Sequence, residues 1–192
     1  MNSKTFRPFG SLRFATIALC AVLSGACKEK SSDGGTSAAA SGKAASVLLD
    51  EASDAMDRKE WTTALSRFDV VVADPKATAD EKASAWEDKV ICEGHAHDDA
   101  AAIAAIEKMK VAKVELTASQ YGRMIQELTA ADRLDAAVAA IAAGTERFKG
   151  DEATKAKFEK AAEILSDRMA EKGDTAGQDK LRALGYVGSK KK

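Results

Sequence analysis

The sequence lacks the motifs of the common enzyme classes. It contains no GxSxG nucleophile elbow, no HExxH metal motif and no glycine-rich loop that could cradle a phosphate. No pair of carboxylates stands at the spacing of a catalytic scaffold that we can recognise. The sequence therefore gives no support for catalysis, and we expect a protein that is not an enzyme and carries no cofactor.

Cysteine is also scarce, and the chain has no excess of positive charge. Only Cys92 lies beyond the first 27 residues, so no intramolecular disulfide is expected in the folded part of the chain. Acidic neighbours would raise the pKa of this thiol, which favours a buried side chain over a nucleophile. The chain has 29 Lys and Arg against 30 Asp and Glu. Because phosphate binding needs a basic stripe, nucleic acid is not expected as a partner.

Residues 1–26 have the organisation of an export signal. Lys4, Arg7 and Arg13 precede an uncharged run over residues 14–23, and small residues follow it. This run is shorter than the roughly 20 apolar residues of a membrane-spanning helix, so a secretory signal peptide is predicted. Its removal would leave 26 Lys and Arg against 30 Asp and Glu, which makes the mature chain mildly acidic at about −4.

The signal ends in the segment Leu-Ser-Gly-Ala-Cys at residues 23–27, which resembles the processing site of bacterial lipoproteins. This resemblance implies cleavage before Cys27, acylation of its thiol with fatty acids such as palmitate, and anchoring in the cell envelope. That family prefers Leu three places before the cysteine, where this chain has Ser24. An ordinary secreted protein that is cleaved after Ala26 is the alternative.

Residues 27–44 are expected to form the lipidated cysteine and a disordered linker. The segment is rich in Gly, Ser, Thr and Ala and has no apolar periodicity, so it cannot offset the entropy cost of ordering. Lys28 follows the cysteine, whereas the lipoprotein pattern associates Asp there with the inner membrane. The resemblance therefore implies the outer membrane, with the protein facing the periplasm. Residues 189–192 form a basic tail that could touch anionic headgroups or remain solvated.

The region from residue 45 to residue 188 is predicted to be an all-α domain. Apolar residues recur at helical spacing, and no stretch alternates with period two for long enough to suggest a strand. Asp74 and Pro75 should end one helix, because proline lacks the amide donor. The expected helices are 45–58, 62–73, 80–93, 98–110, 118–129, 134–149, 152–172 and 178–184.

Several side chains mark the expected helix ends. Thr78 and Thr117 each precede a Glu or Gln by three residues, which is typical of a capping box. Gly94 and Gly150 stand where a left-handed residue commonly follows a helix. Short connections of this kind predict antiparallel helical hairpins.

The hairpins resemble tetratricopeptide (TPR) repeats. Trp61, Ala64 and Phe68, closed by Pro75, follow the spacing of an aromatic, a small residue and a second aromatic in that family. Ala137 and Ile141 copy part of this spacing, and the middle unit follows it less closely. Starts near residues 45, 83 and 118 give repeats of roughly 38 and 35 residues, against 34 in the family. The resemblance covers most of residues 45–149 and implies a short TPR-like solenoid, with residues 152–172 as a capping helix; a generic helical bundle is the alternative.

The TPR resemblance implies a concave groove that is lined by the first helix of each hairpin. The positions that carry over from the family are expected to bind a protein or peptide partner, and they are Leu49, Ser53, Met56, Glu87, Ile91, Gly122, Gln126 and Thr129. The function expected is that of a lipid-anchored envelope adaptor. A self-associating structural envelope lipoprotein is the alternative.

The only other cluster of side chains that could bind a metal is the turn that contains His95 and His97. Imidazoles with nearby carboxylates can bind zinc or copper. However, residues two apart face one ion only in an extended segment, and the sequence has no third histidine. We therefore expect a helix end here, with Asp98 as the cap of the next helix, and a metal-binding periplasmic protein is the weakest alternative. Trp61 and Trp86 are expected to lie in the core.

Overall fold

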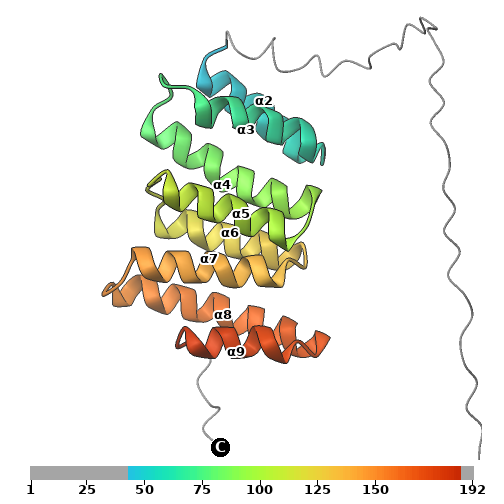
Figure 1. The fold of residues 1–192 in the computed structure, drawn as a ribbon, viewed down its shortest axis with the longest axis vertical. Coiled ribbons are helices and arrows are strands. Elements are labelled where there is room, and N and C mark those ends of the chain that lie inside the picture. Colours follow the sequence, from blue (N-terminus) through green and yellow to red (C-terminus); the bar gives the residue numbers. More distant parts are fainter. Residues whose placement is uncertain (1–42, 187–192) are drawn as a thin grey trace, which may run out of the picture. The chain divides into compact units, whose positions relative to one another are not determined.

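The computed structural model describes residues 43–186, and this part of the chain is helical without any strand (Figure 1). The described helices are α2 (Ala45–Asp57), α3 (Trp61–Ala73), α4 (Ala79–Ala96), α5 (Asp99–Val111), α6 (Ala118–Ala130), α7 (Leu134–Arg147), α8 (Glu152–Lys172) and α9 (Thr175–Ala183). The prediction of an all-α domain is confirmed. The signal peptide, Cys27, nearly all of the linker and the basic tail lie outside the described residues.

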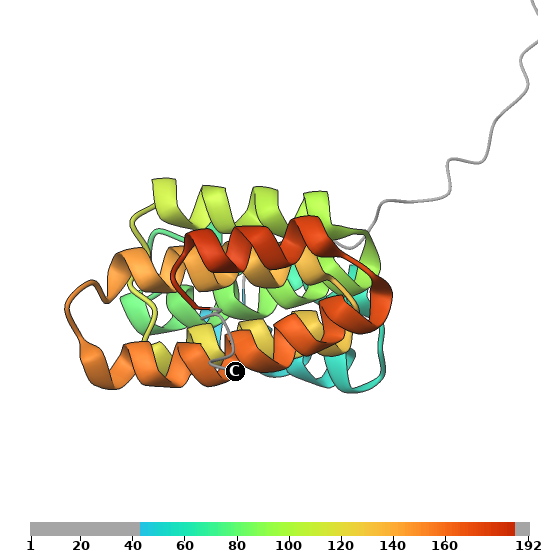
Figure 2. The same cartoon turned by 90° about the horizontal axis from the view of Figure 1, so that it is seen from below.

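The eight described helices form four stacked antiparallel hairpins. The first helices α2, α4, α6 and α8 contact one another in that order, and so do the second helices α5, α7 and α9. Seen along the stack, α5, α7 and α9 lie on one side, while α6 and α8 lie on the other (Figure 2). This arrangement is a helical-hairpin solenoid, in which each unit packs mainly on its neighbours.

The fourth hairpin differs from the expectation for the C-terminal region. Helix α8 packs on α6 and α7 but also pairs with α9, which itself contacts α7. It therefore covers the third hairpin, as the predicted capping helix would, and with α9 it also forms a further hairpin, which was not predicted. Helix α4 begins at Ala79, one residue before the predicted helix start at residue 80, although the repeat spacing places the start of the repeat near residue 83.

A small residue four places before a large apolar one recurs in the second helix of every hairpin. Two helices approach closely only where one of them lacks bulk, and the large side chain then fills the adjoining space. All members of the set are buried, and the pairs are Ala64 with Phe68, Ala102 with Ile106, Ala137 with Ile141, and Gly177 with Leu181. At Gly177 the fit is tight, since an added Cβ would lie 2.6 Å from the Cε of Met169 on α8.

Most of the expected helix ends are observed. Both capping boxes form, with the hydroxyls of Thr78 and Thr117 accepting bonds from backbone amides three residues on. Helix α3 ends at Ala73, directly before Asp74 and Pro75. Gly150 has a φ of 92°, as expected for a residue that follows a helix in the left-handed region.

Gly94 is the exception among these helix ends. Helix α4 continues through it to Ala96, and Gly94 is buried inside the helix. A Cβ at this position would lie 2.6 Å from Cδ2 of Leu128 on α6. The prediction of a left-handed residue is wrong here. The absence of a side chain at Gly94 lets α4 and α6 pack closely, and the residue does not form a turn.

Two helical glycines are expected to respond in opposite ways to alanine. At Gly144 an added Cβ would lie 2.8 Å from Cζ of Phe158 and 3.2 Å from Cγ of Tyr121, so Gly144→Ala should lower the free energy of unfolding by about 1–3 kcal/mol. At Gly122 nothing lies within 4 Å, so Gly122→Ala should raise it by up to about 1 kcal/mol through helix propensity. Urea unfolding of both variants measures the two changes in the free energy of unfolding. If both changes have the same sign, the packing described at Gly144 is contradicted.

Candidate functional site

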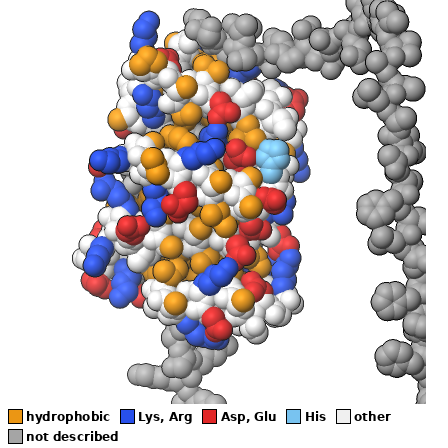
Figure 3. Space-filling model, viewed as in Figure 1, with side chains coloured by type: hydrophobic (Ala, Val, Ile, Leu, Met, Phe, Trp, Pro, Cys, Tyr) orange, Lys and Arg blue, Asp and Glu red, His pale blue; other side chains and the backbone are white. Residues whose placement is uncertain are grey.

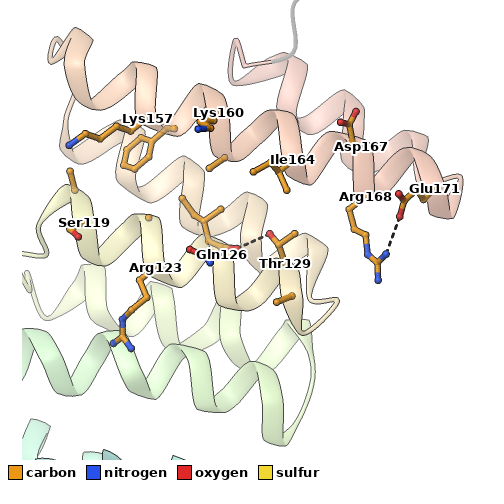
Figure 4. A pocket seen from close by; sticks show the side chains of 16 residues that line it. Ser119, Arg123, Gln126, Thr129, Lys157, Lys160, Ile164, Asp167, Arg168 and Glu171 are labelled. Atoms are coloured by element: carbon orange, nitrogen blue, oxygen red, sulfur yellow. Dashed lines mark hydrogen bonds and ion pairs between the residues drawn. The ribbon is translucent and has the colours of Figure 1, made fainter.

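A groove of about 970 Å³ lies between α6 and α8, the first helices of the third and fourth hairpins (Figure 4). Helix α6 contributes mainly small and polar side chains to it, whereas α8 contributes charged and apolar ones. The residues that line it include Ser119, Gly122, Gln126, Thr129, Lys157 and Ile164. Small residues such as Gly122 on α6 and Ala161 on α8 lie among the larger ones, and the two helices leave this space open.

The floor of the groove is apolar. Ile125 and Phe158 line it and are almost wholly buried, so their side chains hold α6 and α8 in place beneath the opening. Ile164 lines the groove from α8 and is 58% exposed. Gly122 lines the groove from α6, and a Cβ added there would have open space around it. The centre of the groove can therefore accept an apolar side chain.

The rim of the groove carries polar groups with unused hydrogen-bonding capacity. The hydroxyl of Thr129 donates to the carbonyl of Ile125 at 2.7 Å. The side chains of Ser119 and Gln126 make no hydrogen bond with other residues in the part of the chain that the structure describes. These groups can bind the backbone of an incoming chain.

The charged residues of the groove are divided between its two ends. Figure 4 shows Lys157 and Lys160 toward the end where Ser119 lies, and Asp167 and Arg168 beyond Thr129 at the other end. Neither lysine forms an ion pair with another residue in positions 43–186. In contrast, Arg168 pairs with Glu171 at 3.0 Å and lies 3.5 Å from Asp132.

Arg123, the remaining cation of the groove lining, is turned toward α4. Its guanidinium donates to the carboxylates of Glu87 and Asp88. Glu87 is only 4% exposed, so this ion pair is largely removed from water on the carboxylate side. Arg123 therefore joins α6 to α4 and leaves Lys157 and Lys160 as the cations available to a ligand of the groove.

The structure brings together three of the eight residues that were predicted to bind a partner. Gly122, Gln126 and Thr129 all line the groove. Glu87 and Ile91 are buried between helices and do not reach it. The other three do not line it either, because they lie on α2, and they are Leu49, Ser53 and Met56.

The wall that α8 supplies is not among the residues predicted from the sequence. Lys157, Lys160 and Ile164 stand three and four residues apart, which places them on one face of a helix. This spacing is visible in the sequence. The TPR resemblance, however, ends near residue 149 and gives no groove positions in the helix beyond.

A smaller hollow of about 370 Å³ lies beside Tyr121, between the α5–α6 connection and the end of α7. Two of its cations are already paired, because Lys110 lies 3.3 Å from Glu146 and Arg147 lies 3.1 Å from Glu115. Binding of an anion here would have to displace these glutamates. The groove between α6 and α8 is the better candidate.

In the turn with two histidines, the side chains make packing, ion-pair and capping contacts. The ring of His95 stacks on that of Trp61 with centroids 4.2 Å apart, and burial lowers the pKa of His95. Nε2 of His97 lies 3.7 Å from Glu93, and Asp98 caps α5 by accepting from the amide of Ala101. No group of three or more potential metal ligands occurs within residues 43–186.

The remaining residues singled out in the sequence lie in or near the core. Cys92 is buried, and burial together with Asp88 and Glu93 raises the pKa of its thiol to about 12, as expected for a packing side chain. Trp61 and Trp86 are only partly buried, and each packs against a different core cluster. None of the three side chains lines the groove.

Comparisons of this chain with protein-family models, with curated proteins and with solved structures find no match. Among the helices that the structure describes, none is both long and apolar enough to cross a membrane. The fold and the groove define a helical-hairpin solenoid with an open cleft between two first helices.

Proposed function

We propose that this protein binds a peptide segment of another protein in the groove between α6 and α8, as a lipid-anchored adaptor of the bacterial cell envelope. The observation that carries the binding role is the open groove itself, with its apolar floor, its polar rim and the space beside Gly122. The export signal and the resemblance of residues 23–27 to a lipoprotein processing site support the location.

The dimensions and chemistry of the groove favour a peptide. The lining runs along both helices, from Ser119 and Lys157 at one end to Thr129 and Glu171 at the other (Figure 4). An extended surface of this kind is typical of solenoids that bind chain segments. The polar rim suits the backbone of a peptide, while the apolar centre suits one of its side chains.

Self-association finds less support on the described surface. Its large exposed hydrophobic residues are Val47, Val111 and Ile164, which belong to α2, α5 and α8. Because they come from three different hairpins, they do not make one apolar face of the size that subunit interfaces need. Figure 3 shows hydrophobic, basic and acidic side chains mixed over one face of the molecule.

Filling the groove at Gly122 tests the proposal. Short random peptides are displayed and selected on the wild-type protein, and the affinity of an enriched peptide is then measured by fluorescence polarisation. Gly122→Phe should weaken binding at least about tenfold, because the ring occupies the space that an apolar side chain of the peptide would take.

Gly122→Ala is the matched control for this experiment. It removes the same glycine but adds only one carbon in open space, so binding should stay within about twofold of the wild type. If Gly122→Phe binds the peptide as tightly as Gly122→Ala does, the groove between α6 and α8 is not the binding surface.

A further inference from the structure

We infer that the peptide bound in the groove carries an acidic residue close to an aliphatic one, with the acidic residue at the end marked by Lys157 and Lys160. This inference rests on the proposed function and specifies the chemistry of its partner. It follows from the distribution of paired and unpaired charges along the groove and from the place of Ile164 between them.

The positive end is built by two lysines whose charge is not neutralised within the described structure. Lys157 and Lys160 are both exposed, line the groove from the same face of α8 and form no ion pair within residues 43–186. The first turn of α6, with Ser119, lies at the same end (Figure 4), and the dipole of a helix adds positive potential at its N-terminus. A carboxylate of the ligand is favoured here.

The opposite end of the groove carries an unpaired negative charge. Asp167 lines the groove and has no ion-pair partner in the described part of the chain, while Arg168 pairs with Glu171 and with Asp132, which Lys172 also contacts. A second carboxylate at this end would be repelled. The potential therefore changes sign along the groove and fixes the direction in which a charged peptide binds.

The aliphatic requirement comes from Ile164. It follows Lys160 by four residues, so the two side chains are neighbours on one face of α8. Its side chain is 58% exposed and lines the groove, and Figure 4 shows it between Lys160 and Asp167, across from Gln126 and Thr129. A peptide that places a carboxylate on Lys160 can cover Ile164 with a neighbouring aliphatic side chain, which removes both apolar surfaces from water.

Selection of displayed random peptides on two forms of the full-length mature protein tests the inference. On the wild type, enriched peptides should contain Asp or Glu near Leu, Ile or Val. The double variant Lys157→Glu with Lys160→Glu should bind these peptides about tenfold or more weakly and should enrich peptides with Lys or Arg in place of the acids. The wild-type affinity should fall as salt rises, and this dependence should weaken in the variant.

The matched control is Lys149→Glu with Lys155→Glu. It changes the net charge by the same amount at exposed lysines that do not line the groove. The affinity of this control should stay within about twofold of the wild type. Equal losses in the two double variants would show a general charge effect and would overturn the inference.

The outcomes separate this inference from the proposed function. If enriched peptides lack an acidic bias and still lose affinity on Gly122→Phe, the groove binds peptides but the inferred acidic partner is wrong. If no peptide depends on Gly122, both fail. Ile164→Ser should also weaken binding, whereas Val111→Ser, at a position 82% exposed on α5, should not; equal behaviour of these two variants would exclude the aliphatic contact.

Discussion

Phe68→Ala is expected to lower the free energy of unfolding by about 3–5 kcal/mol. The side chain of Phe68 is fully buried in the core of the N-terminal hairpin, among residues of α2, α3 and α4. Removing the ring deletes its burial and leaves a cavity that closely packed helices refill only in part. Urea unfolding followed by circular dichroism measures the change.

A control for this prediction lies on the neighbouring helix. Val47 on α2 is 44% exposed, so Val47→Ala should change the free energy of unfolding by no more than about 0.5 kcal/mol. A loss below about 1 kcal/mol in Phe68→Ala would mean that the first hairpin is not packed as described.

Arg123→Leu should lower the free energy of unfolding by about 2–3 kcal/mol. It removes the partner of Glu87, a carboxylate that is 4% exposed between α4 and α6. Breaking a buried ion pair costs about 3–5 kcal/mol, and the value expected here is lower because the Arg123 side chain is 46% exposed. Burial also raises the pKa of Asp88, which Arg123 partly counteracts, so a second carboxylate loses its partner.

A double-mutant cycle distinguishes loss of the ion pair from loss of packing. Glu87→Leu combined with Arg123→Leu should recover part of the stability, since the buried carboxylate of Glu87 is then absent, while Asp88 still lacks its partner. If the double variant is as unstable as the sum of the single variants, Glu87 and Arg123 do not act as a pair. Thermal or urea unfolding of the three variants measures the cycle.

The sequence predicted the helices well because their signals are local. Capping boxes at Thr78 and Thr117 and the break at Pro75 each involve only a few neighbouring residues, and all three are observed. Gly94 was interpreted incorrectly, because its role depends on Leu128, which lies on a different helix. A local pattern cannot distinguish a glycine that ends a helix from one that admits a neighbouring helix.

The candidate site could be predicted only in part for the same reason. Gly122, Gln126 and Thr129 follow from the position of α6 in its hairpin, and they do line the groove. Lys157 and Ile164 come from a hairpin whose repeat signal is weak, since Leu181 stands where the pattern has an aromatic residue. Their role requires knowing that α8 packs beside α6.

Mapping a selected peptide on the protein by NMR tests the central claim most directly. The peptide is titrated into the isotope-labelled mature protein, and the amide shifts are followed residue by residue. We expect the largest shifts at Gly122, Gln126 and Ile164, with little change in α2 and α3. Shifts that are confined to other helices, or that persist unchanged in Gly122→Phe, would contradict a binding groove between α6 and α8.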